Sequence, residues 1–265
     1  MGIRAWLVVL LFLPSLFLPS SASALPADIV GFGNSITCWD CNDGSYLVWL
    51  EDWGYIDSAE DASFGESADL TSGVLSRLDD WIHGEGDWLP FGPQTADQLI
   101  LLSGTPDTYQ AVGGWKNEPY DPDQTLLNVE AMIDLVLGES IPLILVAPPP
   151  VMDPCGTSYD VPTCDEIDTR LANLAVDLAL LAGTYSDVQF LDLYADFTAD
   201  PRFGDHPGSD SLYRSDGLHP RFETGDALIA SLLVPMLIPE PSTALLLASG
   251  LVALAQRRRG RRKAA

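Results

Sequence analysis

The sequence predicts an α/β domain in which a parallel sheet is covered by helices on both faces. Apolar runs with the length of strands alternate along the chain with segments that have the periodicity of amphipathic helices. The runs are continuously apolar rather than alternating, which is typical of strands buried on both faces. The chain has 265 residues, enough for one such domain with a full core.

Four short apolar runs are expected to form strands: Ile29 to Phe32, Gln98 to Leu102, Pro142 to Val146 and Val188 to Leu193. The first ends at Gly33 and the second at Gly104. Ligands of parallel sheets bind beyond the carboxyl ends of the strands. Residues that directly follow these runs are therefore the first candidates for a functional site.

Five segments are expected to form helices: Tyr46 to Trp53, Leu70 to Ile82, Thr125 to Leu137, Cys164 to Leu181 and Phe222 to Leu237. In the fourth segment the leucines and isoleucine step by four and three residues, which predicts one buried stripe. Residues 194–218 are rich in Asp, Gly and Pro and are expected to form a long loop, of a length that is often functional.

The first 24 residues have the composition of a secretory signal peptide. Arg4 precedes an apolar run from Ala5 to Leu18, and Ala22-Ser23-Ala24 puts small residues before a cleavage site. A membrane anchor is the alternative, but the run is shorter than the roughly 20 residues that span a bilayer. We expect cleavage after Ala24, which leaves a domain over residues 25–237.

Residues 238–265 combine three features in order. Pro239-Glu240-Pro241 is followed by an apolar run, Ala244 to Ala255, and then by five arginines and a lysine within 257–263. The run is short for a membrane span, but the basic cluster would resist translocation. This order resembles the PEP-CTERM sorting signal; an ordinary terminal helix is the alternative. The resemblance implies an exosortase partner, a precursor tethered by a transmembrane helix, and delivery to the envelope or matrix of a Gram-negative bacterium.

The charge of the chain is strongly acidic, with 13 basic and 38 acidic residues and a net charge of −25. Seven of the basic residues and none of the acidic ones lie in residues 1–24 and 244–265, so the rest of the chain carries 6 basic against 38 acidic residues. Such a surface repels nucleic acid and anionic lipid. Nucleic acids and other polyanions are therefore excluded as expected partners.

The four cysteines of an exported chain are expected to form disulfides. Three pairings exist, and we favour the two that are local in sequence, Cys38 with Cys41 and Cys155 with Cys164. A thioredoxin-like redox pair at Cys38 and Cys41 is a weaker alternative. A zinc site is weaker still, because the spacing of the second pair is too wide.

Two segments that are distant in the sequence carry the candidate catalytic residues. Ser35 follows the first expected strand, and Asp216 and His219 lie near the last loop-to-helix junction. Each segment alone reads as a turn or a helix cap. Together they supply a hydroxyl, an imidazole that can accept its proton, and a carboxylate that can orient the imidazole. His206, beside Asp205, is a second candidate for the base.

These segments resemble the sequence blocks of the SGNH, or GDSL-type, hydrolases over roughly residues 28–234. Block I is matched by Gly33-Asn34-Ser35 with Asn in place of Asp, and block V by Asp216-Gly217-Leu218-His219-Pro220. Gly65-Glu66-Ser67, with Arg77-Leu78 downstream, resembles block II, and Gly104-Thr105-Pro106-Asp107 aligns with block III. The resemblance implies a three-layer α/β/α sandwich with a parallel sheet of about five strands. It also implies an oxyanion site formed by the backbone N–H groups of Ser35 and Gly65.

Block III departs from the family at one residue. The family asparagine, whose side-chain amide binds the oxyanion, is Pro106 here, and proline cannot donate a hydrogen bond. Loss of one such donor typically costs about 10²–10³ in turnover. Thr105 and Asn34 are the candidates for a substitute donor.

The expected function is hydrolysis of acyl or acetyl esters by Ser35, His219 and Asp216, without a cofactor or catalytic metal. The expected substrate is an acylated saccharide or a small acyl or lipid ester. One alternative is a weakened carbohydrate-binding or matrix protein on the same fold, suggested by Pro106 and by tryptophans such as Trp39 and Trp81. A lipase or acyltransferase is another. Calcium binding by Asp205 and Asp210 is less favoured, because no EF-hand spacing is present.

Overall fold

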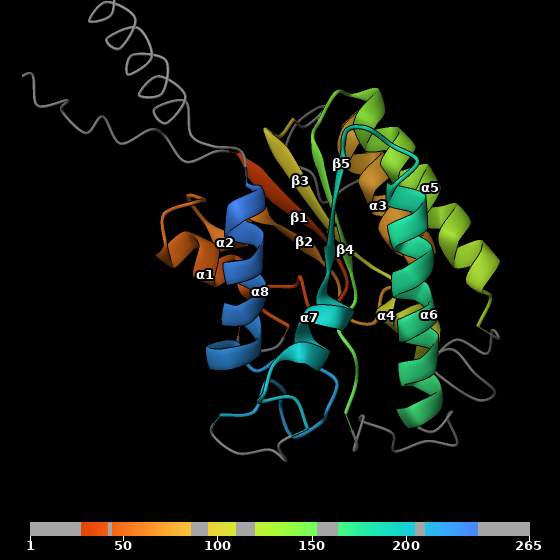
Figure 1. The fold of residues 1–265 in the computed structure, drawn as a ribbon. Coiled ribbons are helices and arrows are strands. Elements are labelled where there is room, and N and C mark those ends of the chain that lie inside the picture. Colours follow the sequence, from red (N-terminus) through yellow and green to blue (C-terminus); the bar gives the residue numbers. More distant parts are fainter. Residues whose placement is uncertain are drawn as a thin grey trace, which may run out of the picture. The chain divides into compact units, whose positions relative to one another are not determined.

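The computed structural model describes residues 28–41, 44–85, 95–109, 120–152, 164–204 and 210–237. These residues belong to one compact unit, Pro26–Ile238. A sheet lies between two sets of helices, which gives the three-layer sandwich that the sequence predicts (Figure 1).

The sheet has five parallel strands in the order β2-β1-β3-β4-β5. Their bounds are β1 Ile29–Gly33, β2 Ser63–Gly65, β3 Gln98–Leu102, β4 Leu143–Ala147 and β5 Val188–Asp192. The four expected strands are confirmed. The edge strand β2 was not expected, because three half-buried residues are too few to form an apolar run.

Eight α-helices are assigned within the described residues. They are α1 Tyr46–Asp52, α2 Ala59–Ala62, α3 Thr71–His83, α4 Thr105–Tyr109, α5 Pro122–Gly138, α6 Cys164–Ala182, α7 Leu193–Ala199 and α8 Ala227–Leu233. Helix α5 begins three residues before the expected start. Asp121 accepts a hydrogen bond from Gln124 N there, and Pro122 occupies the first turn, which tolerates proline.

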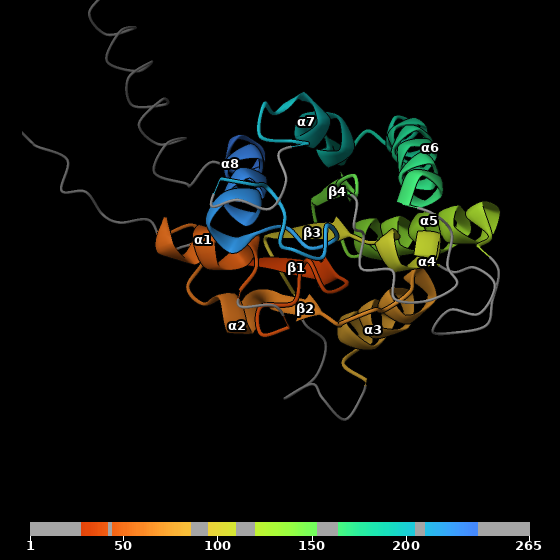
Figure 2. The same ribbon diagram turned by 90° about the horizontal axis from the view of Figure 1, so that it is seen from below.

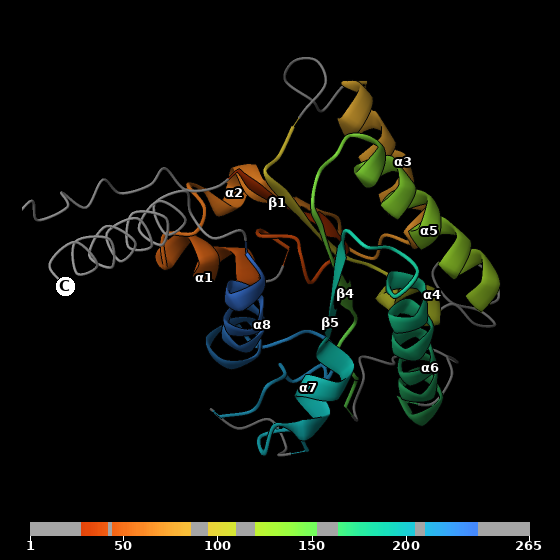
Figure 3. The ribbon, with the colours of Figure 1, turned by 45° about the horizontal axis from the view of Figure 1, so that its top comes forward.

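Alternate residues of the strands enter two separate cores. Ile29, Ile100 and Ile144 pack with helices α1 and α8 on one face, whereas Val30, Leu99 and Leu143 pack with α3, α5 and α6 on the other. The two helix layers lie on opposite sides of the sheet when the molecule is turned (Figures 2 and 3). The prediction that the strands are covered on both faces is therefore confirmed.

Two expectations about the C-terminal third were wrong. Residues 194–218 are not a continuous loop, because α7 occupies Leu193–Ala199. The side chain of Asp192 accepts from Ala195 N, and the buried pair Leu193 and Phe197, four residues apart, anchors this helix. The expected helix from Phe222 to Leu237 is also divided: a π-turn η1, Phe222–Asp226, precedes α8, and a 3-10 turn η2, Val234–Met236, follows it.

None of the helices within the described ranges is both long and apolar enough to cross a membrane. The expected signal peptide and the apolar run of the sorting tail lie outside those ranges.

Candidate active site

The turn that carries Ser35 leaves the carboxyl end of β1. The backbone oxygen of Asn34 accepts from Thr37 N at 3.0 Å and from Cys38 N at 3.1 Å. The side-chain oxygen of Asn34 accepts from Ile36 N at 3.0 Å. These bonds close the turn and leave the Ser35 side chain projecting beyond the end of the sheet.

The three residues expected to form the catalytic triad lie in hydrogen-bonding contact. Ser35 Oγ is 2.9 Å from His219 Nε2, and His219 Nδ1 is 2.8 Å from Asp216 Oδ2. The second oxygen of Asp216 accepts from the backbone N–H groups of Leu218 at 2.9 Å and His219 at 3.0 Å. A hydroxyl, an imidazole and a carboxylate thus form one continuous chain of hydrogen bonds, although Ser35 and His219 are 184 residues apart in the sequence.

The carboxylate of Asp216 is stabilised in its charged form. Burial alone would raise its pKa, but hydrogen bonds from the His219 ring and from two backbone N–H groups outweigh burial and lower the pKa to about 2. An ionised carboxylate can hold the imidazole with Nδ1 protonated, which leaves Nε2 free to accept a proton from Ser35.

The end of β2 packs against the nucleophile turn. A Cβ at Gly65 would lie 2.3 Å from Cys38 N and 2.7 Å from Asn34 O, so this close approach requires glycine. Gly65 is paired with Gly33, and Glu66 N donates to Gly33 O at 3.3 Å. Because groups alternate along a parallel strand, the N–H of Gly65 itself points away from β1.

The chain then makes a turn from Glu66 to Asp69, closed by Asp69 N donating to Glu66 O at 3.3 Å. Ala68 within this turn has φ of +57°, a left-handed conformation that costs a residue with a Cβ roughly 1–2 kcal/mol. Strained backbone of this kind persists only where the surroundings hold it.

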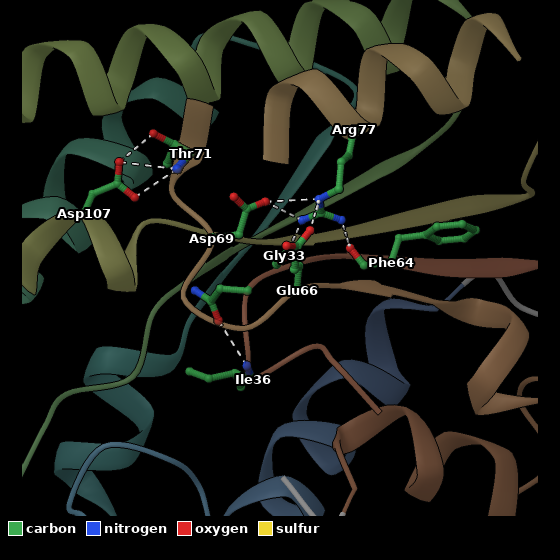
Figure 4. A network of polar contacts seen from close by, with 9 residues as sticks. Gly33, Ile36, Phe64, Glu66, Asp69, Thr71, Arg77 and Asp107 are labelled. Carbon is green, nitrogen blue, oxygen red and sulfur yellow. Dashed lines mark hydrogen bonds and ion pairs between the residues drawn. The ribbon is translucent and has the colours of Figure 1, made fainter. Parts of the chain in front are cut away.

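Arg77, on α3, lies at the centre of the contacts that hold these segments (Figure 4). Its guanidinium donates to Gly33 O at 3.0 Å, to Phe64 O at 2.5 Å and to Asp69 Oδ2 at 2.7 Å. Glu66 lies at 3.5 Å from the same group. The sequence indicated Arg77 only as part of the block II resemblance, and it gave no sign of the buried partner Asp69.

Asp107 joins α4 to the start of α3 (Figure 4). Its carboxylate accepts from Thr71 N at 3.0 Å and from Thr71 Oγ1 at 2.7 Å. Burial raises the pKa of Asp107, and the hydrogen bonds from Thr71 oppose that rise. The carboxylate therefore caps the helix that carries Arg77.

Several buried donors in the described residues have no hydrogen-bond partner, among them both expected substitutes for the amide missing at Pro106. Pro106 is the second residue of α4. Thr105 and Asn34 are both buried, and Thr105 Oγ1 and Asn34 Nδ2 have no hydrogen-bond partner. They follow the ends of β3 and β1, which are adjacent strands paired through Leu102 and Gly33.

The disulfide Cys38–Cys41 is present directly after the nucleophile turn, as expected. Cys164 is also disulfide-bonded, whereas Cys155, its expected partner, lies outside the described residues. In the described part of the chain, the one cluster of three metal-ligating side chains is Cys38, Asp40 and Cys41. Its two thiols are oxidised to the disulfide, so this cluster does not fit a zinc ion.

The remaining expected site residues differ in their exposure or lie outside the described residues. Trp81 is buried in the core, whereas Trp39 is 37 % exposed beside the disulfide. The second candidate base, His206, and the calcium candidate Asp205 lie outside the described residues.

The fold is similar to that of solved structures described as lipases and acylhydrolases, several of them of the GDSL type. A lipase/acylhydrolase from Enterococcus faecalis has a TM-score of 0.55 and 23 % identity, over 78 % of this chain and 93 % of its own. An acetyl xylan esterase has a TM-score of 0.55 and 18 % identity, over 79 % and 99 %. A GDSL-like lipase from Bacteroides thetaiotaomicron has a TM-score of 0.51 and 20 % identity, over 79 % and 88 %.

The C-terminal segment, residues 237–259, matches the model of the PEP-CTERM protein-sorting motif. A search of curated proteins found no match. The motif marks an exported protein that is recognised by an exosortase and sorted at the envelope. The solved structures establish the shared fold, and the sorting motif establishes the export route.

Proposed function

We propose that this protein is an exported serine ester hydrolase in which Ser35 is the nucleophile, His219 the general base and Asp216 the residue that orients the base. The observation that carries the proposal is the continuous path from Ser35 Oγ through His219 to Asp216, with distances of 2.9 and 2.8 Å. This is the geometry that acyl transfer to a serine requires.

In the proposed mechanism, Ser35 Oγ attacks the ester carbonyl while His219 Nε2 takes the hydroxyl proton. The ring then carries a positive charge, which the ionised Asp216 stabilises. Collapse of the tetrahedral intermediate expels the alcohol, which receives the proton from His219. Water, deprotonated by the same ring, attacks the acyl-enzyme, and collapse of the second tetrahedral intermediate releases the acid while His219 returns the proton to Ser35 Oγ. Side chains and water suffice for these steps, so no cofactor or metal is assigned a role.

The oxyanion is proposed to bind to backbone N–H groups. Ser35 N is the first donor, and Gly65 N is the donor that the resemblance implies. The direction of the Gly65 N–H, away from β1, favours a second candidate, the N–H of Ala68 in the strained turn. Thr105 Oγ1 and Asn34 Nδ2 are proposed substitutes for the amide missing at Pro106, because both are buried donors without a partner.

These donors can be tested in the enzyme phosphonylated at Ser35, where a phosphonyl oxygen occupies the oxyanion position. The amide proton that binds it should move strongly downfield in the NMR spectrum relative to the free protein. A shift at Ala68 but not at Gly65 would reject Gly65, and the reverse would reject Ala68. If Thr105→Ala and Asn34→Ala both leave ester turnover unchanged, neither side chain is a substitute donor.

The proposed substrates are acetyl groups on envelope or extracellular polysaccharide. An acetyl xylan esterase shares the fold, the sorting motif directs the protein to the envelope, and the acidic body disfavours anionic lipid surfaces. We propose a precursor tethered in the inner membrane of a Gram-negative bacterium. Short acyl or lipid esters, and transfer of the acyl group to an alcohol, are the competing activities within the same chemistry.

The decisive experiment compares the wild-type protein with Ser35→Ala on nitrophenyl esters and acetylated sugars. The wild type should release acid and be labelled by a fluorophosphonate at Ser35, and the variant should lose both properties. Folded wild-type protein that neither turns over esters nor takes the label would instead support the carbohydrate-binding alternative. Product analysis with an added alcohol separates hydrolysis from acyl transfer.

A further inference from the structure

Arg77 makes no contact with the triad in the structure, yet it binds the backbone on both sides of the proposed oxyanion position. Its hydrogen bonds reach Gly33 O, two residues before the nucleophile, and Phe64 O, directly before Gly65. We propose that Arg77 is a positioning residue for transition-state stabilisation, holding the end of β1 and the 64–69 segment in the relative arrangement that the oxyanion requires. This inference rests on the proposed function.

The contact with Phe64 O fixes the orientation of a whole peptide group. A trans peptide is planar, and its N–H points opposite to its C=O. The pairing of β2 with β1 orients the Gly65 N–H, and Arg77 bound to Phe64 O restrains the same peptide group in that orientation where the chain enters the following turn. A charged donor on a carbonyl also polarises the peptide, which makes its N–H a stronger donor.

The contact with Asp69 fixes the other end of the same segment. Asp69 is 8 % exposed, and its Oδ2 accepts from Nη2 of Arg77 at 2.7 Å and from Nε at 3.1 Å. A Cβ at Gly73 would lie 1.9 Å from Asp69 Oδ1, so glycine at this position of α3 leaves the space that the carboxylate fills. The strained residue Ala68 thus lies in the sequence between Phe64 and Asp69, the two points of this segment that Arg77 binds.

Only an arginine can make these contacts together. The planar guanidinium presents five donors in a fixed fork, whereas a lysine ammonium is a single point of charge. Four bonds from three nitrogens reach two strands and one turn. The contacts with two backbone oxygens cannot be explained as an ion pair alone, because Asp69 would pair equally well with a lysine.

The first test uses Arg77→Lys and Arg77→Met, with Arg202→Gln as the matched control. Arg202 also pairs with a carboxylate, Asp200 at 2.7 Å, but contacts none of the segments described here. We expect kcat to fall about 10²-fold in both Arg77 variants with KM nearly unchanged, because misplacement of supporting groups costs this much. Affinity for a trifluoromethyl ketone, whose adduct mimics the oxyanion, should fall by the same factor, and Arg202→Gln should retain both values.

A second readout does not require activity. In the NMR spectrum of the free protein, Arg77→Lys should shift the amide resonances of Gly65 and Ala68, whereas Arg202→Gln should not. Unchanged resonances in folded Arg77→Lys would overturn the proposal, as would an equal loss of affinity for substrate and for the ketone. If the wild type lacks esterase activity altogether, the proposed function fails, while the amide shifts still decide whether Arg77 positions this segment.

Discussion

The two sides of the candidate site are held in different ways. The Asp216–His219 side is stabilised mainly by its own backbone: Asp216 accepts from residues two and three positions on, and Arg214 N donates to His219 O at 3.0 Å. The Ser35 side depends on α3. Arg77 on this helix donates to Gly33 O, 44 residues earlier in the sequence, and to Asp69 Oδ2, 8 residues earlier. Asp216 and His219 are thus oriented within a short motif, whereas the turn of Ser35 and the end of β2 are held by a distant helix.

This difference predicts that substitutions in the Asp216–His219 motif act most strongly on turnover, whereas substitutions that weaken the contacts of α3 act on the stability of the fold.

Asp216→Asn should have the largest effect. The amide oxygen can still accept from the backbone, but the charge that stabilises the imidazolium is lost, so we expect kcat to fall about 10⁴-fold and the melting temperature at neutral pH to fall as well. Esterase kinetics and thermal unfolding measure both quantities. Glu223→Gln, an exposed carboxylate four residues beyond His219, is the control and should remain active. A fall of less than tenfold would contradict the role of Asp216.

Asp107→Ala should act mainly on stability. It removes the acceptor for Thr71 N and Thr71 Oγ1 at the start of α3, which should cost about 1–2 kcal/mol of unfolding free energy. Urea denaturation measures the change. Asp107→Asn keeps one acceptor oxygen. It also removes a carboxylate whose pKa is raised by burial, so its loss of unfolding free energy should be smaller than that of Asp107→Ala. Equal losses in the two variants would show that the cap is not the source of stability.

Acidification should remove the contribution of Asp216 to stability. Its folded-state pKa is about 2, below the ordinary value of 3.8. The stabilisation is therefore complete above about pH 5 and is lost as the pH falls toward 2. Unfolding curves of wild type and Asp216→Asn should differ at pH 6 and converge near pH 2. A difference that stays constant down to pH 2 would show that the charge is not responsible.

Ala68→Gly should give the smallest change. Glycine relieves the left-handed conformation but is more flexible when unfolded, so we expect a stabilisation below about 1 kcal/mol. Ser140→Gly is the matched control, since Ser140 has φ of +62° after α5, outside the site. Both variants should gain similar stability in chemical denaturation, and Ala68→Gly alone should alter kcat. Loss of stability in Ala68→Gly would show that the turn is not strained.

The same difference explains what the sequence could predict. Ser35 and the pair Asp216 and His219 were identified because each lies in a short motif whose contacts are local or follow a strand end. A parallel sheet of about five strands was implied by a resemblance, and the apolar runs predicted four of the strands, but neither predicted the strand order. Helix α7 was missed although Asp192 and the Leu193–Phe197 pair signalled it, because Asp, Gly and Pro dominate the surrounding composition.

Other features had no local signal. Strand β2 is too short, and its pairing with β1 depends on contacts outside its own residues. The direction of the Gly65 N–H follows from the register of that pairing, which a glycine in a motif does not reveal. Asp69 and Phe64 could be linked to Arg77 only after α3 had been placed against the sheet.

The disulfide between Cys38 and Cys41 sets the order of two steps in the maturation of the protein, export and formation of the covalent ring. Cys38 N closes the turn of Ser35, and the same residue abuts Gly65, so the covalent ring begins where this turn meets the end of β2. Thiols stay reduced in the cytoplasm and pair in oxidising compartments. The covalent restraint beside Ser35 is therefore expected to form after translocation, so this end of the sheet reaches its final covalent state at the destination rather than at the ribosome.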